Sequence, residues 1–303
     1  MASSSRGRRL AVAVLAVALS LASIAGDAAG TAVHLKRPLI VFLSDFGTID
    51  DAVAICKGAM VSVAPDAEII DLTHQVTPFS ITEGARLLAR TAPYYPVDTV
   101  FVAVVDPGVG TSRKPIVVKT RRGQYFVLPD NGLVTPLVDR DGLVGAREIR
   151  NPAWLLGGKL SSTFHGRDVF SPVAAHLARG DDWLQVGPGL PTLERLETPK
   201  AVVNERGITG SVVALDGPYG NLVTNIDGNE FRQLGYAPGD AVRVKVGAET
   251  VTVPFAATFG DVPLGKELVF IDSRGLLSLA INQGNFARSH GVNPPVELVV
   301  FRK

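Results

Sequence analysis

The sequence predicts an α/β N-terminal domain with a mostly parallel sheet, followed by a small all-β, barrel-like C-terminal domain. In the first half, apolar runs rich in β-branched residues alternate three times with helical patterns, which is typical of a parallel sheet covered by helices. From residue 207 onward, short strands separated by turn residues indicate a sandwich or barrel. With 303 residues, 46% of them hydrophobic, the chain is long enough for two domains with buried cores.

We expect four segments: a signal peptide at 1–30, the α/β domain at 36–190, a linker at 191–206 and the β-domain at 207–303. The first segment has arginines at its start, an apolar stretch at 10–22 and then small residues, as an export signal does. The apolar stretch is short for a bilayer span, although an uncleaved membrane anchor is the alternative. The chain is therefore expected to be exported, to the periplasm or outside the cell, without membrane contact in its mature form.

Individual elements follow from the same patterns. The expected strands of the first domain are 37–44, 67–72 and 99–105, with a hairpin of 116–120 and 125–128, and its expected helices are about 48–63, 81–92 and 168–178. The expected strands of the second domain are 207–216, 241–246, 249–254, 267–272 and 296–301.

Carboxylates follow two of the buried strands at the point where each ends. Asp45 ends the run at 37–44, and Asp106 ends the run at 99–105 in the stretch V-V-D-P-G-V-G-T-S-R. Ligands of open α/β sheets bind beyond the carboxyl ends of the strands. Arg113 is placed to fold back, pair with Asp106 and keep it ionised. His165 precedes the helix at 168–178 and can project into the same crevice, although a surface turn and a structural histidine are the plainer alternatives.

Two loops of the second domain also carry chemically useful residues. They are D-G-P-Y-G-N at 216–221 and D-S-R-G at 272–275. Either loop taken alone is also compatible with an ordinary β-turn.

Composition excludes several classes of protein. A formal net charge of +1 without a long basic run argues against nucleic-acid binding. The single cysteine, Cys56, excludes an intrachain disulfide framework and a cysteine-rich metal site. P-loop, dinucleotide-binding, H-E-x-x-H and G-x-S-x-G motifs are absent from the sequence. A divalent-metal site of a phosphatase, built from Asp45, Asp50, Asp51 and Asp106, remains an alternative, but we expect no metal and no cofactor.

A series of motifs then occurs in a recognisable order: S-D-F-G-T-x-D-D, C-K-G, E-G-A-R, D-P-G-V-G-T-x-R, P-D-N-G-L, T-F-H-G-R-D, D-x-P-Y-G-N-L-x-T-N-I and D-S-R-G-x-L-S-L-A. Together they resemble the adenosine-forming S-adenosylmethionine (SAM) hydrolases, also called SAM hydroxide adenosyltransferases, which are relatives of the fluorinase and chlorinase enzymes. The resemblance covers residues 38 to 301.

The resemblance implies a fold, a reaction and an assembly. The family has an N-terminal α/β domain and a C-terminal β-barrel, and it forms homotrimers with each active site between the N-terminal domain of one subunit and the C-terminal domain of a neighbour. It hydrolyses SAM to adenosine and L-methionine without a metal, so SAM is the expected small-molecule partner and substrate.

The resemblance also assigns roles to residues of this sequence. The water-handling trio matches Asp106, Arg113 and His165. The carboxylate that binds the ribose diol matches Asp45. Substrate contacts match Asp216 for the methionine amino group, Ser273 and Arg274 for its carboxylate, Asn221 for adenine, and Phe79, Tyr219 and Phe259 for the pocket walls.

The resemblance also favours water over a halide as the nucleophile. The halogenating relatives carry an uncharged residue where Asp106 stands, and an ionised carboxylate there would repel a halide. The chain also lacks the loop that fluorinases insert between about 120 and 125.

Export leaves three hypotheses open, because SAM is an intracellular metabolite. The enzyme scavenges or destroys SAM outside the cytoplasm, it acts on a related nucleoside, or it is an exported nucleoside-binding or SAM-binding protein without turnover.

Overall fold

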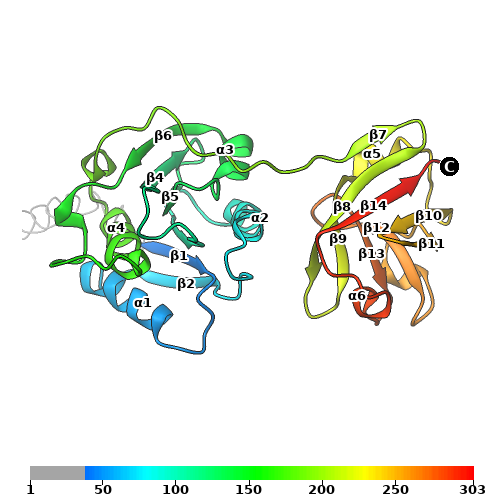
Figure 1. Cartoon of the computed structure of the whole chain (residues 1–303), viewed down its shortest axis with the longest axis horizontal. Coiled ribbons are helices and arrows are strands. Elements are labelled where there is room, and N and C mark those ends of the chain that lie inside the picture. The colour runs from blue at the N-terminus through cyan, green and yellow to red at the C-terminus, as the bar shows by residue number, and fades with distance from the viewer. Residues whose placement is uncertain (1–37) are drawn as a thin grey trace, which may run out of the picture. The chain divides into compact units, whose positions relative to one another are not determined.

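The first half of the chain folds around a six-stranded sheet with the order β2-β1-β3-β5-β4-β6 (Figure 1). The computed structural model describes residues 38–303, so the predicted signal peptide lies outside the described residues. The strands are β1 (Leu39–Ser44), β2 (Glu68–Thr73), β3 (Val100–Val104), β4 (Pro115–Thr120), β5 (Tyr125–Pro129) and β6 (Leu143–Glu148). The pairs β1–β2, β1–β3 and β3–β5 are parallel, whereas β4 is antiparallel to β5 and β6. The mostly parallel sheet and the hairpin are both confirmed.

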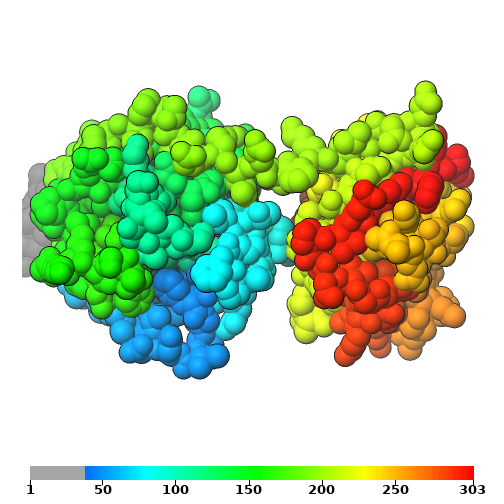
Figure 2. All heavy atoms as spheres, in the orientation of Figure 1, coloured from blue at the N-terminus to red at the C-terminus, as the bar shows by residue number. Residues whose placement is uncertain are grey.

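Helices cover both faces of this sheet. The helices are α1 (Ala52–Val63), α2 (Ile81–Thr91), α3 (Thr135–Asp141) and α4 (Ser171–Ala178). Along β1, Ile40 and Phe42 pack with residues of α1 and α4, while Val41 and Leu43 pack with residues of α2 and α3. A strand with helices on both faces is apolar throughout, as the sequence of β1 is. Figure 2 shows α1 and α2, in blue and cyan, at the surface of this domain.

The expected helix at 168–178 begins differently from the prediction. Its first part is a π-helical turn, η3 (Gly166–Phe170), which continues into α4 and is preceded by His165. Short π-helical segments frequently occur at functional sites. Short 3₁₀ turns complete the domain: η1 (Ala92–Tyr94), η2 (Pro152–Trp154) and η4 (Trp183–Val186). No helix in the described part of the chain combines the length and hydrophobicity that a membrane span requires.

The second half of the chain forms an antiparallel sheet that is nearly a closed barrel. Its order is β11-β10-β14-β8-β9-β13-β12, and β7 pairs with β8. The elements are β7 (Val202–Asn204), β8 (Gly207–Asp216), β9 (Asn221–Asp227), α5 (Gly228–Arg232), β10 (Ala241–Val246), β11 (Glu249–Pro254), η5 (Phe259–Asp261), β12 (Glu267–Ile271), β13 (Leu276–Ile281), α6 (Phe286–Ser289) and β14 (Val296–Phe301). A bridge between Phe255 and Val269 brings the two ends of the sheet together. The expected barrel-like domain is confirmed.

Strands β9 and β13 escaped prediction because each carries a polar residue in the core. Thr224 of β9 and Ser278 of β13 are fully buried. Thr224 Oγ1 donates to the carbonyl oxygen of Leu277 at 2.7 Å, and Ser278 Oγ donates to Asp272 Oδ2 at 2.8 Å. These hydrogen bonds make the burial acceptable, but the residues interrupt the apolar pattern on which strand prediction depends.

His290 contacts three elements of the barrel domain, β11, β12 and α6. His290 Nδ1 lies 2.9 Å from Glu249 Oε2 of β11, and its Nε2 lies 2.8 Å from Glu267 Oε1 of β12. The ring also stacks on Phe286 of α6, with centroids 4.2 Å apart. Burial lowers the pKa of His290, but the two carboxylates raise it more, so the net direction is upward.

This contact predicts a pH-dependent contribution to stability. A raised folded-state pKa stabilises the fold below the unfolded pKa of about 6.5, and the contribution is lost as pH rises through the folded pKa. His290→Gln should therefore lower the urea midpoint of unfolding more at acidic pH than at alkaline pH, compared with the unchanged chain at each pH. An equal loss at both pH values would contradict the assignment.

Candidate active site

Two carboxylates leave the first sheet at the same edge. Ser44, the last residue of β1, is in register with Val104, the last residue of the parallel strand β3. Asp45 and Asp106 follow these strand ends and both line a cavity of about 250 Å³. The cavity is also lined by Phe46, Pro78, Phe79, Val104, Val109, Thr163, Phe164, His165 and Gly166. A cavity therefore lies beyond the strand ends, where the sequence predicts a site.

Arg113 holds Asp106 with two hydrogen bonds. Its Nε donates to Asp106 Oδ1 at 3.0 Å, and its Nη2 donates to Asp106 Oδ2. Both side chains are almost completely buried, with 7% of Arg113 and 5% of Asp106 exposed. The guanidinium carbon of Arg113 lies 5.4 Å from the ring centroid of Phe170, within cation–π range. The expected pairing of Asp106 with Arg113 is thus observed as a buried, bidentate contact.

The conformation of the loop between Asp106 and Arg113 requires a glycine at position 110. Gly110 has a φ of +76°, and a Cβ atom there would lie 2.3 Å from the carbonyl oxygen of Ser162. A larger residue is excluded because the backbone of residue 162 lies directly against the loop. This close approach brings the segment before His165 next to the loop that follows Asp106.

Burial changes the expected acidity of Asp106. Burial raises the pKa of its carboxyl group, and Arg113 opposes this effect without reversing it. The ion pair alone predicts the opposite direction, so burial determines the net direction of this pKa shift. Since a stronger base has a higher pKa, burial makes Asp106 a better proton acceptor than an exposed aspartate.

His165 completes the predicted trio. Its Nδ1 lies 3.2 Å from Arg113 Nη2. A guanidinium only donates hydrogen bonds, so Nδ1 accepts and the proton of the neutral ring is on Nε2. Burial and the charge of Arg113 lower the pKa of His165, against the opposing effect of Asp106. The neutral ring therefore keeps Nε2–H as a donor.

One nitrogen of Arg113 remains available. Its Nη1 is buried and has no hydrogen-bond partner among the residues that the structure describes. Buried donors are normally satisfied, often by water. The trio thus offers an acceptor on Asp106 and donors on Arg113 and His165.

Asp45 is fixed by the backbone of Phe79. The Phe79 N–H donates to Asp45 Oδ2 at 2.8 Å. Phe79 has a φ of +68°, which is unusual for a bulky side chain and typical of constrained functional loops. Phe79 is 70% exposed and lines the cavity. The remaining lone pairs of the Asp45 carboxylate can accept from the two hydroxyls of a diol.

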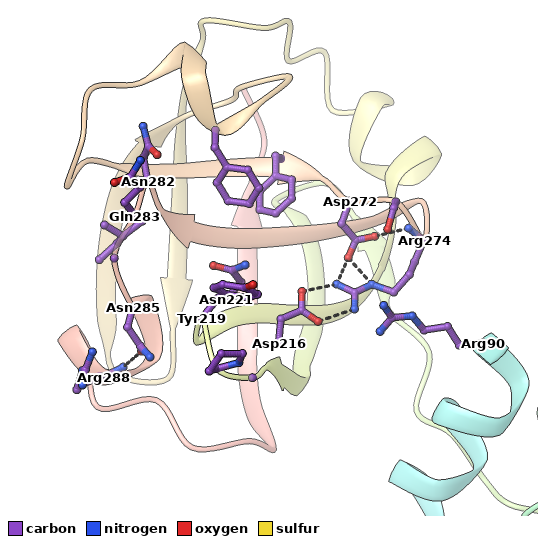
Figure 3. Close-up of a pocket in the computed structure, with 17 residues that line it drawn as sticks. Arg90, Asp216, Tyr219, Asn221, Asp272, Arg274, Asn282, Gln283, Asn285 and Arg288 are labelled. Carbon is purple, nitrogen blue, oxygen red and sulfur yellow. Dashed lines mark hydrogen bonds and ion pairs between the residues drawn. The ribbon is translucent and has the colours of Figure 1, made fainter. Parts of the chain in front are cut away.

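The other predicted residues line a pocket of the C-terminal domain (Figure 3). They are Asp216, Tyr219, Asn221, Phe259, Ser273 and Arg274. Asp216 ends β8 and Asn221 begins β9, while Ser273 and Arg274 lie in the turn between β12 and β13. The structure thus brings the eleven predicted residues into two groups, one in each domain.

An ion-pair cluster dominates this second pocket. Arg274 Nη1 and Nη2 donate to the two oxygens of Asp216 at 2.8 and 2.9 Å, and Arg274 Nε donates to Asp272 Oδ2 at 2.6 Å. Burial lowers the pKa of Arg274, but the bonds to both carboxylates outweigh burial and raise it. The pKa of Asp272 is lowered, because its bonds to Arg274 and Ser278 outweigh burial. With two carboxylates and one guanidinium, the cluster carries one net negative charge.

Asp272 is a member of this cluster for which the sequence predicts no role. It is 5% exposed, and its Oδ1 accepts from the backbone N–H of Arg274 at 2.8 Å. The spacing D-x-R in a turn was the available signal, since an aspartate commonly accepts from the backbone two residues later.

The metal alternative needs several ligating side chains close together. Within residues 38–303, no three His, Cys, Asp or Glu side chains form a group that could hold a metal ion.

Sequence models match both halves of the chain. The SAM hydroxide adenosyltransferase N-terminal domain matches residues 40–187, and the SAM hydroxide adenosyltransferase C-terminal domain matches residues 210–298. The chain belongs to the SAM hydroxide adenosyltransferase family.

Similar proteins within this family have two kinds of name. An (R)-S-adenosyl-L-methionine hydrolase from Salinispora arenicola is 41% identical over 268 residues, covering 88% of this chain and 98% of that protein. A fluorinase from Actinoplanes sp. is 31% identical over 291 residues, covering 87% of this chain and 97% of that protein. The crystal structure of an uncharacterized conserved protein from Thermotoga maritima matches with a TM-score of 0.83 and 41% identity, covering 87% of this chain and 100% of that chain.

The environment of His165 can be tested by titration. We expect its imidazole to titrate below the usual value of about 6.5 by NMR, because burial and Arg113 disfavour the charged ring. Arg113→Gln should raise this pKa, since it removes a cation and leaves the Asp106 charge unpaired. His290, whose pKa is raised, is the internal reference. A His165 pKa above the usual value in the unchanged chain would contradict the assigned contacts.

Proposed function

We propose that this chain hydrolyses S-adenosyl-L-methionine to adenosine and L-methionine. The observation that carries the proposal is the trio at the first cavity: a buried Asp106 with a raised pKa, held by Arg113, beside a neutral His165. Membership of the family and the hydrolase relatives support the same activity.

The reaction needs one oriented water molecule. Its oxygen attacks C5′ of the ribose in line with the C5′–S bond, the C–S bond breaks, and the electron pair leaves with sulfur as the neutral thioether of methionine. The leaving group needs no proton, so the water proton is the only one to be moved. Asp106 accepts or directs that proton, while the donors of Arg113 and His165 hold the water.

The charge of Asp106 favours water over a halide. An anion next to the nucleophile would repel fluoride or chloride, whereas a carboxylate can accept a hydrogen bond from water. The proposal is therefore hydrolysis rather than halogenation, even though fluorinases are among the similar proteins.

The ion-pair cluster of the second pocket suits the zwitterionic end of methionine. Asp216 binds the ammonium group, and Ser273 with Arg274 binds the carboxylate. Without a ligand, Asp216 and Arg274 bind each other. A bound amino acid would replace this one ion pair with two, between its ammonium group and Asp216 and between its carboxylate and Arg274. Asp272 keeps Arg274 in place during the exchange. Tyr219, Asn221 and Phe259 are left to contact the adenosine part.

We further propose that the chain acts as a homotrimer with sites shared between subunits. The grouping of the predicted residues into one set in each domain supports this arrangement. Shared sites predict that two variants, Asp106→Ala and Asp216→Ala, complement each other when mixed and refolded together, as assayed at a SAM concentration well below the raised KM of Asp216→Ala. Some sites of the mixed trimer would then combine an intact Asp106 with an intact Asp216, and failure to regain activity in a mixed oligomer would contradict shared sites.

Export through the segment 1–30 is likewise a proposal, supported by its basic start and apolar centre. Cell fractionation should find the chain outside the cytoplasm, shortened at its N-terminus. A full-length chain in the cytoplasm would contradict it.

A product assay tests the proposed reaction. The purified chain, incubated with SAM and EDTA, should release adenosine and methionine in equal amounts, as measured by liquid chromatography. Loss of activity with EDTA would support the metal alternative. SAM recovered bound and intact would indicate a binding protein.

The role of Asp106 predicts a large loss of turnover. Asp106→Ala should lower kcat by about two to four orders of magnitude, the usual contribution of a general base. Nearly unchanged turnover, measured at saturating SAM, would refute the assignment.

Asp216→Ala is the matched control for this experiment. It removes a carboxylate that binds the substrate and takes no part in moving the proton. We expect it to raise KM while kcat at saturating substrate stays close to normal. A comparable fall in kcat would contradict the division of roles.

A further inference from the structure

A chain of polar contacts leads from the partly exposed side chains of Lys57 and Asp71 to the buried His74 and Ser44, beside Asp45. Ser44 Oγ lies 2.7 Å from His74 Nδ1, and His74 Nε2 lies 3.1 Å from Asp71 Oδ1. Asp71 Oδ2 in turn accepts from Lys57 Nζ at 2.6 Å. The four residues come from the end of β1, the segment after β2, β2 itself and α1. None of the four takes part in the proposed reaction.

A serine, a histidine and an aspartate in contact also form the nucleophilic set of many hydrolases. Ser44 cannot act in that way here, because it is completely buried and His74 is only 4% exposed. A nucleophile must reach its substrate. The contacts therefore point to a structural task near the site.

The positions of these contacts identify that task. Asp71 Oδ1 faces His74 Nε2 at 3.1 Å, and the Ser44 hydroxyl lies against Nδ1 of the same ring. Ser44 Oγ then accepts from the backbone N–H of Phe46 at 3.3 Å. The chain of contacts thus runs from Asp71 to the residue that follows Asp45.

Backbone hydrogen bonds also join the segment that follows β2 to the loop that carries Asp45. The carbonyl oxygen of His74 accepts from Gly47 N–H at 2.7 Å, and the N–H of Val76 donates to the carbonyl oxygen of Ser44 at 3.4 Å. Further along the segment, Phe79 N–H binds the Asp45 carboxylate itself. Asp45 is therefore enclosed between two loops that are cross-linked at His74.

We propose that His74 is a positioning residue for Asp45 and, through it, determines the preference of the site for ribose over 2′-deoxyribose. Asp45 can bind both hydroxyls of a diol only if its carboxylate keeps one orientation, and the His74–Ser44 contact fixes the loop that carries it. The inference rests on the proposed function, in which Asp45 binds the ribose.

Nucleoside binding tests this inference without requiring turnover. The dissociation constants of adenosine and 2′-deoxyadenosine are measured by calorimetry on the full chain. We expect the unchanged chain to prefer adenosine by about tenfold to a hundredfold, the range for hydrogen bonds to a charged group. His74→Leu should lower this preference at least about fivefold, because a loosened loop misplaces the carboxylate.

Two further variants, His74→Asn and Ser44→Ala, distinguish loss of the His74–Ser44 contact from a folding defect. His74→Asn retains a polar atom at the position of Nδ1 and should keep most of the preference, while Ser44→Ala should lose it as His74→Leu does. The matched control is His176→Leu, since His176 is also mostly buried, bonds to Asp181 at 2.6 Å and stacks on Trp154. This control should leave the preference unchanged.

A double variant separates positioning from general destabilisation. In the Asp45→Ala background, His74→Leu should cause no further loss of preference, because the group that it positions is gone. An unchanged preference in His74→Leu, an equal loss in His176→Leu, or additive losses with Asp45→Ala would overturn the inference. Absence of any ribose preference in the unchanged chain would instead refute the role of Asp45 in the proposed function.

Discussion

The buried ion pair between Asp106 and Arg113 is the interaction on which the first site depends. Two charges almost removed from water are costly unless their geometry is good and their hydrogen bonds are complete. The bidentate contact, the ring of Phe170 and the nearby His165 meet much of that requirement. The remaining effect of burial raises the pKa of Asp106, which suits its proposed role of taking a proton from water.

A parallel sheet supplies the positions that this ion pair needs. Because β1 and β3 end in register, their following loops deliver Asp45 and Asp106 to one cavity. The sequence predicted this arrangement, since apolar β-branched runs that end in an aspartate are a local pattern. It did not predict the raised pKa of Asp106, the π-helical start after His165 or the polar cores of β9 and β13, because each depends on groups brought together by folding.

The second domain also places charged side chains together in its pocket, in the cluster of Asp216, Asp272 and Arg274. Arg274 lies between Asp216 and Asp272, so two carboxylates hold its guanidinium before any ligand binds. The sequence identified Asp216 and Arg274 by their motifs but not the link to Asp272, nor the contact of His74 with Ser44. In both contacts, Asp272 with Arg274 and His74 with Ser44, one residue positions a neighbouring part of the chain, which a local sequence pattern does not reveal. Within each domain, a buried polar residue thus contacts a segment that carries a predicted substrate-binding residue.

The central claim is that water attacks C5′ of the substrate ribose. Hydrolysis of SAM in water enriched in heavy oxygen tests it directly, with mass spectrometry of both products. The account predicts one heavy oxygen atom in adenosine and none in methionine. Heavy oxygen in the amino-acid product, or its absence from both products, would contradict attack at C5′ by solvent water.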